Sequence, residues 1–155
     1  MTATDLRKLG QLPWRDRWLL AEAMVSLGLA RLSILTLPFR WLVASEAGRS
    51  TRHSATGAAL EDQQIVHARR VRWAIGVAAG HTPWQSNCLA QALAARGMLK
   101  WRRTPSTLHL GVRKDDGGKL EAHAWLRCDD MAVTGGRGQE HYAVLGTFFG
   151  KGLDR

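Results

Sequence analysis

Apolar residues recur with helical spacing early in this 155-residue chain and with a period of two near its end. Apolar positions predominate over residues 14–37, where Pro13 suits a first helical turn and Pro38 cannot continue a helix. A second helix is predicted over residues 60–79, whose first turn carries the carboxylates that the helix dipole favours. We therefore expect two long helices before residue 80.

The segment between these helices, residues 44–59, is small and polar, which predicts a loop. A third helix is predicted within PWQSNCLAQALAARGML, residues 83–99. Asn87 or Ser86 suits its N-cap, because a short polar side chain can accept a hydrogen bond from the first turn of the backbone. Cys88 therefore falls in the first turn of the third helix.

Beyond residue 105 the alternation of apolar and polar residues predicts an antiparallel sheet. Turns rich in glycine and aspartate separate the alternating segments, which are residues 107–113, 120–128, 131–134 and 141–149. Helices first and antiparallel strands afterwards are typical of the α+β class.

The first helix is apolar around much of its circumference, yet it does not predict a transmembrane segment. Glu22 and Arg31 divide it into pieces shorter than the roughly 18 to 20 uncharged residues that a membrane span needs. A buried packing helix is favoured over a helix that lies in a membrane interface, because an interfacial helix usually has a sharper polar face.

The composition, 45% hydrophobic and 23% charged, is that of a folded chain. A net charge of +9 favours anionic partners such as nucleic acid, an acidic peptide or a membrane surface. No recognition-helix, zinc or aromatic-interleaved strand motif is present, so no nucleic-acid partner is expected. Four arginines could bind acidic residues of a partner or form a solvated face: Arg69, Arg70, Arg102 and Arg103.

Cysteine usage limits the compartment and the kind of site. The two cysteines, Cys88 and Cys128, belong to no CxxC or other zinc-ligand spacing, so neither a metal site nor a disulfide framework is expected. The start of the chain shows no secretion signal. Together these features predict a cytoplasmic protein.

Cys88 and His123 are the candidate reactive groups. A helix start favours the thiolate, which is the reactive form of cysteine, although a buried structural cysteine could also lie there. His123 alternates with the apolar positions of segment 120–128 and lies on the opposite face beside Trp125. An imidazole that can deprotonate a thiol is the arrangement used by thiol enzymes.

The motifs PWQSNCLAQAL, LHLGVRKDDGGKLEAHAWLR, a GG loop and YAVLGTFF resemble the transglutaminase-like B proteins of lasso-peptide biosynthesis. The resemblance implies a transglutaminase-like (papain-like) cysteine peptidase fold, in which N-terminal helices precede an antiparallel sheet. It implies one domain over residues 1–155, made of an N-terminal helical region (1–43), a loop (44–59) and a catalytic core (60–155).

In this family Cys88 matches the nucleophile and His123 the base. The resemblance implies a cysteine protease that removes the leader from a ribosomally made precursor peptide, which frees the core N-terminus for macrolactam formation. That ring closure would belong to a separate lasso cyclase that uses ATP, and no cofactor is expected in this chain. A leader-binding module has no room here, so a separate leader-recognition protein is implied.

The family's catalytic aspartate is expected about 12 residues after His123, where this chain has glycines at 135 and 136. Asp129 and Asp130 lie about 20 Å along the strand from His123, at roughly 3.3 Å per residue, and are poor partners for its ring. We expect Glu140 or a backbone carbonyl to orient the imidazole instead.

Other residues have candidate roles beside the nucleophile. The Cys88 N–H is a natural oxyanion donor, and Gln85 could add a side-chain N–H or simply face water. Trp84 and Trp125 could line the cleft or serve only packing. Two other functions remain open: acyl transfer to an amine, which shares the thioester intermediate, and a non-catalytic basic adaptor that binds peptide.

Overall fold

The computed structural model describes residues 12–38, 60–84, 86–115 and 117–150. Its helices are α2 (Trp14–Thr36), α4 (Asp62–Ala79) and α5 (Cys88–Trp101). They precede the strands β1 (Ser106–Lys114), β2 (Leu120–Cys128), β3 (Met131–Thr134) and β4 (Ala143–Gly150), with a short 3-10 turn, η2 (Gln139–His141), before β4. The α+β prediction is confirmed, and the predicted loop 44–59 lies outside the described residues.

The helix starts follow from local capping. Glu61 caps α4 and forms a reciprocal capping box with Gln64. Asn87 caps α5, where its side-chain oxygen accepts a hydrogen bond of 2.9 Å from the Ala90 N–H. Cys88 is therefore the first residue of α5, in agreement with the sequence prediction.

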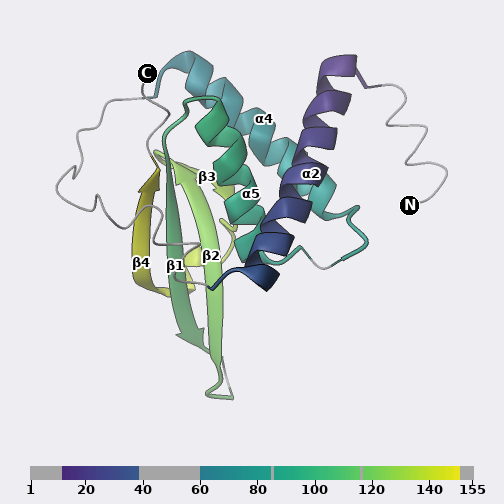
Figure 1. Ribbon diagram of the computed structural model, residues 1–155. Helices are drawn as coiled ribbons and strands as arrows, with labels where there is room; N and C mark the ends of the chain where they lie inside the picture. Colours follow the sequence, from purple (N-terminus) through teal and green to yellow (C-terminus); the bar gives the residue numbers. More distant parts are fainter. Residues whose placement is uncertain (1–11, 39–59, 85, 116, 151–155) are drawn as a thin grey trace.

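The strands form an antiparallel sheet in the order β3-β2-β1-β4 (Figure 1). Cys128 pairs with Met131 as the predicted hairpin requires. An irregularity between Leu126 and Arg127 then shifts the register of β2 against β3, so Leu126 faces Thr134. The last strand, β4, pairs with β1 and not with its neighbour in sequence, β3.

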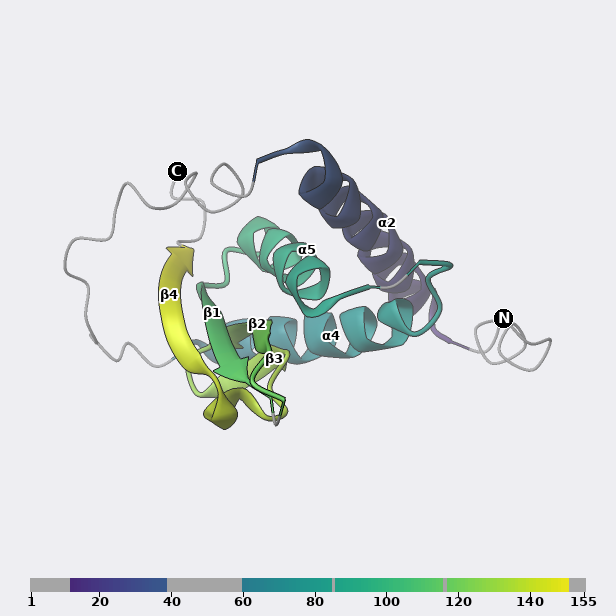
Figure 2. The same cartoon turned by 90° about the horizontal axis from the view of Figure 1, so that it is seen from below.

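The helices lie on one side of the curved sheet (Figure 2). The sheet contributes Leu108, Ala124, Leu126 and Cys128 to the core between the two layers. Strand alternation therefore places His123 and its neighbour Trp125 away from this helix-facing set. The core also contains buried helix residues, among them Leu27, Ile75, Met98 and Leu99.

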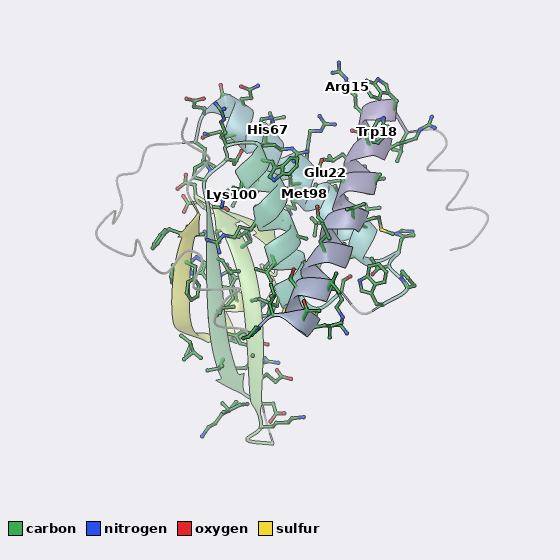
Figure 3. The ribbon with its side chains drawn as sticks, viewed as in Figure 1. Arg15, Trp18, Glu22, His67, Met98 and Lys100 are labelled. Atoms are coloured by element: carbon green, nitrogen blue, oxygen red, sulfur yellow. The ribbon has the colours of Figure 1, made fainter. Side chains whose placement is uncertain are left out.

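Charged pairs tie α2 to the other helices. Arg70 of α4 donates to Asp16 at 2.8 Å. Arg102, just after α5, donates to Glu22 and also to the Met98 carbonyl, each at 2.8 Å. Figure 3 shows Glu22 and Met98 facing each other where α2 and α5 approach. Two of the arginines considered for partner binding are thus engaged inside the molecule.

Helix α2 has two apolar sides in different surroundings. One side packs into the core through Leu19, Leu20, Ala23, Leu27 and Ala30. The other side exposes a stripe of large apolar residues: Trp14, Trp18, Val25, Leu29, Leu32 and Leu35. An 18-residue stretch of α2 has a mean hydropathy of 1.6, which would also suit a membrane span. Of this stretch, 28% is buried inside the molecule. The absence of a transmembrane segment stays a prediction.

Candidate active site

Cys88 is half-buried at the first position of α5, where the unpaired backbone N–H groups of the first turn gather. The segment before it is held by side-chain hydrogen bonds. The Thr82 hydroxyl donates to the Trp84 carbonyl and lies 2.9 Å from the Ser86 hydroxyl. One turn into the helix, the Gln91 amide donates to the Ser86 carbonyl at 2.7 Å. These contacts fix the approach of the chain to Cys88.

The His123 ring is fixed by a backbone carbonyl. Its Nε2 lies 2.8 Å from the carbonyl oxygen of Gly135. A carbonyl oxygen can only accept, so in the neutral ring Nε2 carries the proton and Nδ1 keeps a lone pair. The arrangement gives His123 the tautomer that a general base needs.

Gly135 is in a conformation that favours glycine. Its φ is +63°, and a Cβ there would lie 2.6 Å from the Ala124 carbonyl oxygen. The residue 12 positions after His123 therefore contacts the imidazole through its main chain.

The alternative carboxylates have other partners. Glu140 lies 3.5 Å from His141 and is well exposed, and Asp130 lies 3.8 Å from Arg127. The identity of a third catalytic member stays a prediction.

Aromatic rings pack around His123 on the sheet face away from the core. Trp125, 4% exposed, stacks between His109, at 5.4 Å between ring centroids, and His123, at 5.8 Å. Tyr142 approaches His123 at 4.9 Å. Opposite His123 in the β1–β2 register lies Gly111, where a Cβ would come within 2.9 Å of the Trp125 ring. The imidazole is thus held by packing as well as by its hydrogen bond.

The structure does not bring all of the predicted site residues into contact with one another. Within the described residues, no hydrogen bond joins the Cys88 thiol to the His123 ring. Gln85 lies outside the described residues. Trp84 is exposed and lies near Gly28 of α2, where a Cβ would be 3.8 Å from its ring. The pairing of Cys88 with His123 stays a prediction, and in free enzymes such catalytic contacts are often long.

Two titratable groups of the sheet have shifted pKa values. Burial raises the pKa of the Cys128 thiol to about 12, so this cysteine remains protonated at neutral pH. Burial, and next the positive charge of Arg127, lower the pKa of His109 below its ordinary value. Of the residues that the structure describes, no cluster of three His, Cys, Asp or Glu side chains could hold a metal ion.

Residues 33–147 match the sequence profile of the transglutaminase-like superfamily. This chain belongs to that superfamily. Comparisons with curated proteins and with solved structures gave no significant match. Members of the superfamily are typically cysteine-based enzymes, and the matched range includes Cys88, His123 and Gly135.

The sequence pattern does not identify several residues that surround His123. It predicts the Gly135 carbonyl only as an unspecified backbone acceptor. His109 and Tyr142 come from β1 and from the segment before β4, which pairs with β1 through a non-local contact. The period-two pattern of β1 places His109 on the same face as Gly111, which pairs with His123. This alternation is the one sequence signal that could have predicted His109 beside the site.

Proposed function

We propose that this superfamily member is a cysteine peptidase that removes the leader from a ribosomally made lasso-peptide precursor. The observation that carries the catalytic part is the hydrogen bond from His123 Nε2 to the Gly135 carbonyl, because it leaves Nδ1 free to accept a proton. The choice of a lasso precursor rests on the resemblance of the motifs around Cys88 and His123.

In the proposed reaction the Cys88 thiol transfers its proton to His123 Nδ1, and the thiolate attacks the scissile carbonyl carbon. The oxyanion of the tetrahedral intermediate accepts a hydrogen bond from the Cys88 N–H at the helix start. The C–N bond breaks as the imidazolium protonates the leaving amine, which is the new N-terminus of the core peptide. Water, deprotonated by His123, then hydrolyses the thioester and releases the leader as a carboxylic acid.

The proposal includes two partner proteins. A separate recognition protein would present the leader, and an ATP-using cyclase would close the ring on the freed amine. The chain itself would act in the cytoplasm without a cofactor. Its net charge of +9 suits an acidic peptide partner.

A second candidate function is acyl transfer, which superfamily membership supports equally, because an amine can replace water in the last step. The product distinguishes the two reactions. Hydrolysis adds water to the leader fragment, whereas acyl transfer joins the leader to the acceptor amine.

The test incubates the precursor peptide with this chain, the recognition protein and the cyclase, and follows the products by mass spectrometry. Cys88→Ala should abolish cleavage, because no other group of the site can form the thioester. Cys128→Ala is the matched control and should retain cleavage, since its protonated thiol lies in the core. Cleavage by folded Cys88→Ala protein would overturn the mechanism.

The orienting group is tested in the same assay. If the Gly135 carbonyl holds His123, Glu140→Gln and the double change Asp129→Asn, Asp130→Asn should each alter the rate only slightly. Loss of a carboxylate that orients a catalytic histidine costs about 10⁴-fold. A loss of that size in folded Glu140→Gln protein would assign the role to Glu140.

A further inference from the structure

A cleft of about 380 Å³ lies between α4, α5 and the end of β3. It is lined by Arg72, Ile75, Gly76, Gln91, residues 132–134, Gly135, Gly136 and Arg137. We propose that this cleft binds the side-chain carboxylate of an acidic residue in the substrate peptide. The inference deepens the proposed function, on which the identity of the ligand as a peptide rests.

The side chains and backbone of the cleft supply hydrogen-bond donors for an anion. Arg72 and Arg137 reach it from α4 and from the loop after β3, and no carboxylate belongs to its lining. Among the described residues, neither arginine makes an ion pair. Arg70 and Arg102, by contrast, are paired with Asp16 and Glu22. The two arginines match the charge of a ligand carboxylate, and a guanidinium can donate two parallel hydrogen bonds to a carboxylate.

Thr134 gives an independent sign that a ligand atom belongs in the cleft. It is 7% exposed, and its hydroxyl has no hydrogen-bond partner among the residues that the structure describes. Its cross-strand partner is Leu126, a member of the core, so Thr134 lies on the helix-facing side of the sheet, toward the cleft. Thr104, buried to a similar degree, donates to the Arg102 carbonyl. A buried hydroxyl without a partner is costly, and a carboxylate oxygen would accept its hydrogen bond.

The cleft adjoins both parts of the candidate catalytic site. Gln91 follows Cys88 by one helical turn, and its amide reaches back to the Ser86 carbonyl. Gly135 lines the cleft and also accepts the hydrogen bond of His123. A carboxylate bound here would fix the position of the peptide relative to the thiol and the imidazole. The cleft therefore acts as a specificity subsite that selects peptides with an acidic residue near the cut.

The test measures binding without cleavage. The full-length ¹⁵N-labelled protein is titrated with the peptide acetyl-Gly-Glu-Gly-amide and, in parallel, with its glutamine counterpart. The amide signals of Gly135 and Gly136 should move with the glutamate peptide only. The double change Arg72→Gln, Arg137→Gln should weaken that binding by about tenfold or more, since each charge-assisted contact is lost. Arg69→Gln, an exposed arginine of α4 outside the cleft, is the control and should bind as the natural protein does.

Thr134→Val separates a ligand-binding role from a structural one. The change keeps the shape of the side chain and removes the unpartnered hydroxyl. It should weaken binding of the glutamate peptide severalfold and raise the melting temperature of the ligand-free protein. A residue with only a structural role would lower the melting temperature and leave binding unchanged.

The subsite proposal would be overturned if the amide signals of Gly135 and Gly136 moved equally with both peptides. It would also be overturned if the folded double variant bound the glutamate peptide as tightly as the natural protein does. Because this assay involves no bond cleavage, its outcome is independent of the Cys88→Ala experiment. A chain that binds the glutamate peptide but cuts no precursor would retain the subsite and lose the proposed peptidase activity.

Discussion

The two cysteines of the chain lie in contrasting regions of the same molecule. Cys88 begins α5, half-buried, where backbone N–H groups have no helical partner. Cys128 ends β2 with no exposed surface, among core residues of the helix-facing side. Its pKa is raised to about 12 by burial alone. The first position offers a thiol to solvent and to a ligand, and the second uses sulfur as a small apolar side chain.

The position of a cysteine within its helix or strand determines what its thiol can do. Strand alternation sends Cys128 into the core together with Ala124 and Leu126. The cap at Asn87 places the next residue at the helix end, which no neighbouring turn covers. Of the two cysteines, only Cys88 is partly exposed and lies at a helix start, where a ligand can approach its thiol.

Alkylation gives the largest expected contrast. At pH of about 8, a thiol of pKa about 12 is ionised in roughly one molecule in 10⁴. We therefore expect iodoacetamide to modify Cys128 of the native protein about 10³-fold more slowly than an unburied thiol, and to modify Cys88 first. Peptide mapping by mass spectrometry measures both sites. Equal rates of modification at the two cysteines in folded protein would contradict this expectation.

Substitution of two glycines by alanine should change the stability of the protein in opposite directions. Gly135→Ala should destabilise the protein by about 2–4 kcal/mol, from the left-handed backbone and the contact with the Ala124 carbonyl. Gly97→Ala, in the helix that begins at Cys88, meets nothing within 4 Å and should stabilise it by about 0.5–1 kcal/mol. Urea unfolding of both variants provides the measurement. Similar effects at both glycines would show that the Gly135 conformation is not required.

Serine substitutions extend the contrast to stability. Cys128→Ser places a hydroxyl in the core and should cost about 1–3 kcal/mol of unfolding free energy. Cys88→Ser should cost about 0.5 kcal/mol or less, since its helix-start position is half-buried. Chemical denaturation monitored by circular dichroism distinguishes the two. A larger loss at Cys88 would mean that its thiol has a structural role.

The smallest expected effect concerns the pH dependence set by His109. Its lowered pKa means that the unfolded chain binds the proton more readily than the folded one. The contribution of His109 to stability is therefore complete above a pH of about 6.5 and declines as the pH falls below it. His109→Phe, which keeps a ring against Trp125, should flatten that acid decline. Melting temperatures recorded across this range test it, and an unchanged slope would contradict it.

Local rules predicted most of the fold. The N-cap at Asn87 and the capping box at Glu61 satisfy backbone groups within one turn, so neighbouring residues suffice to predict them. The strands β2 and β3 follow from alternation and from a turn of two aspartates. The position of β4 beside β1 depends on a contact between residues far apart in sequence, which no local pattern encodes.

The sequence nominates two candidate reactive groups but not the residues that surround them. Cys88 begins a helix, and His123 lies on the face of its strand opposite the apolar positions. The irregularity at Leu126 and Arg127 changes the register of the hairpin, so the partner of His123 could not be read from counting residues. The cleft beside Gly135 joins residues of three elements and has no signature in any single segment.

The strand order has a consequence for the synthesis of the protein. During translation the β1–β2 hairpin is complete before residues 143–150 exist, so the outer edge of β1 has no strand partner in that interval. An unpaired edge recruits strands from other chains, and nascent or crowded molecules aggregate by this route. A lower expression temperature or slower initiation of translation lowers the concentration of such incomplete chains. Either should raise the yield of folded protein more than substitutions in the helices would.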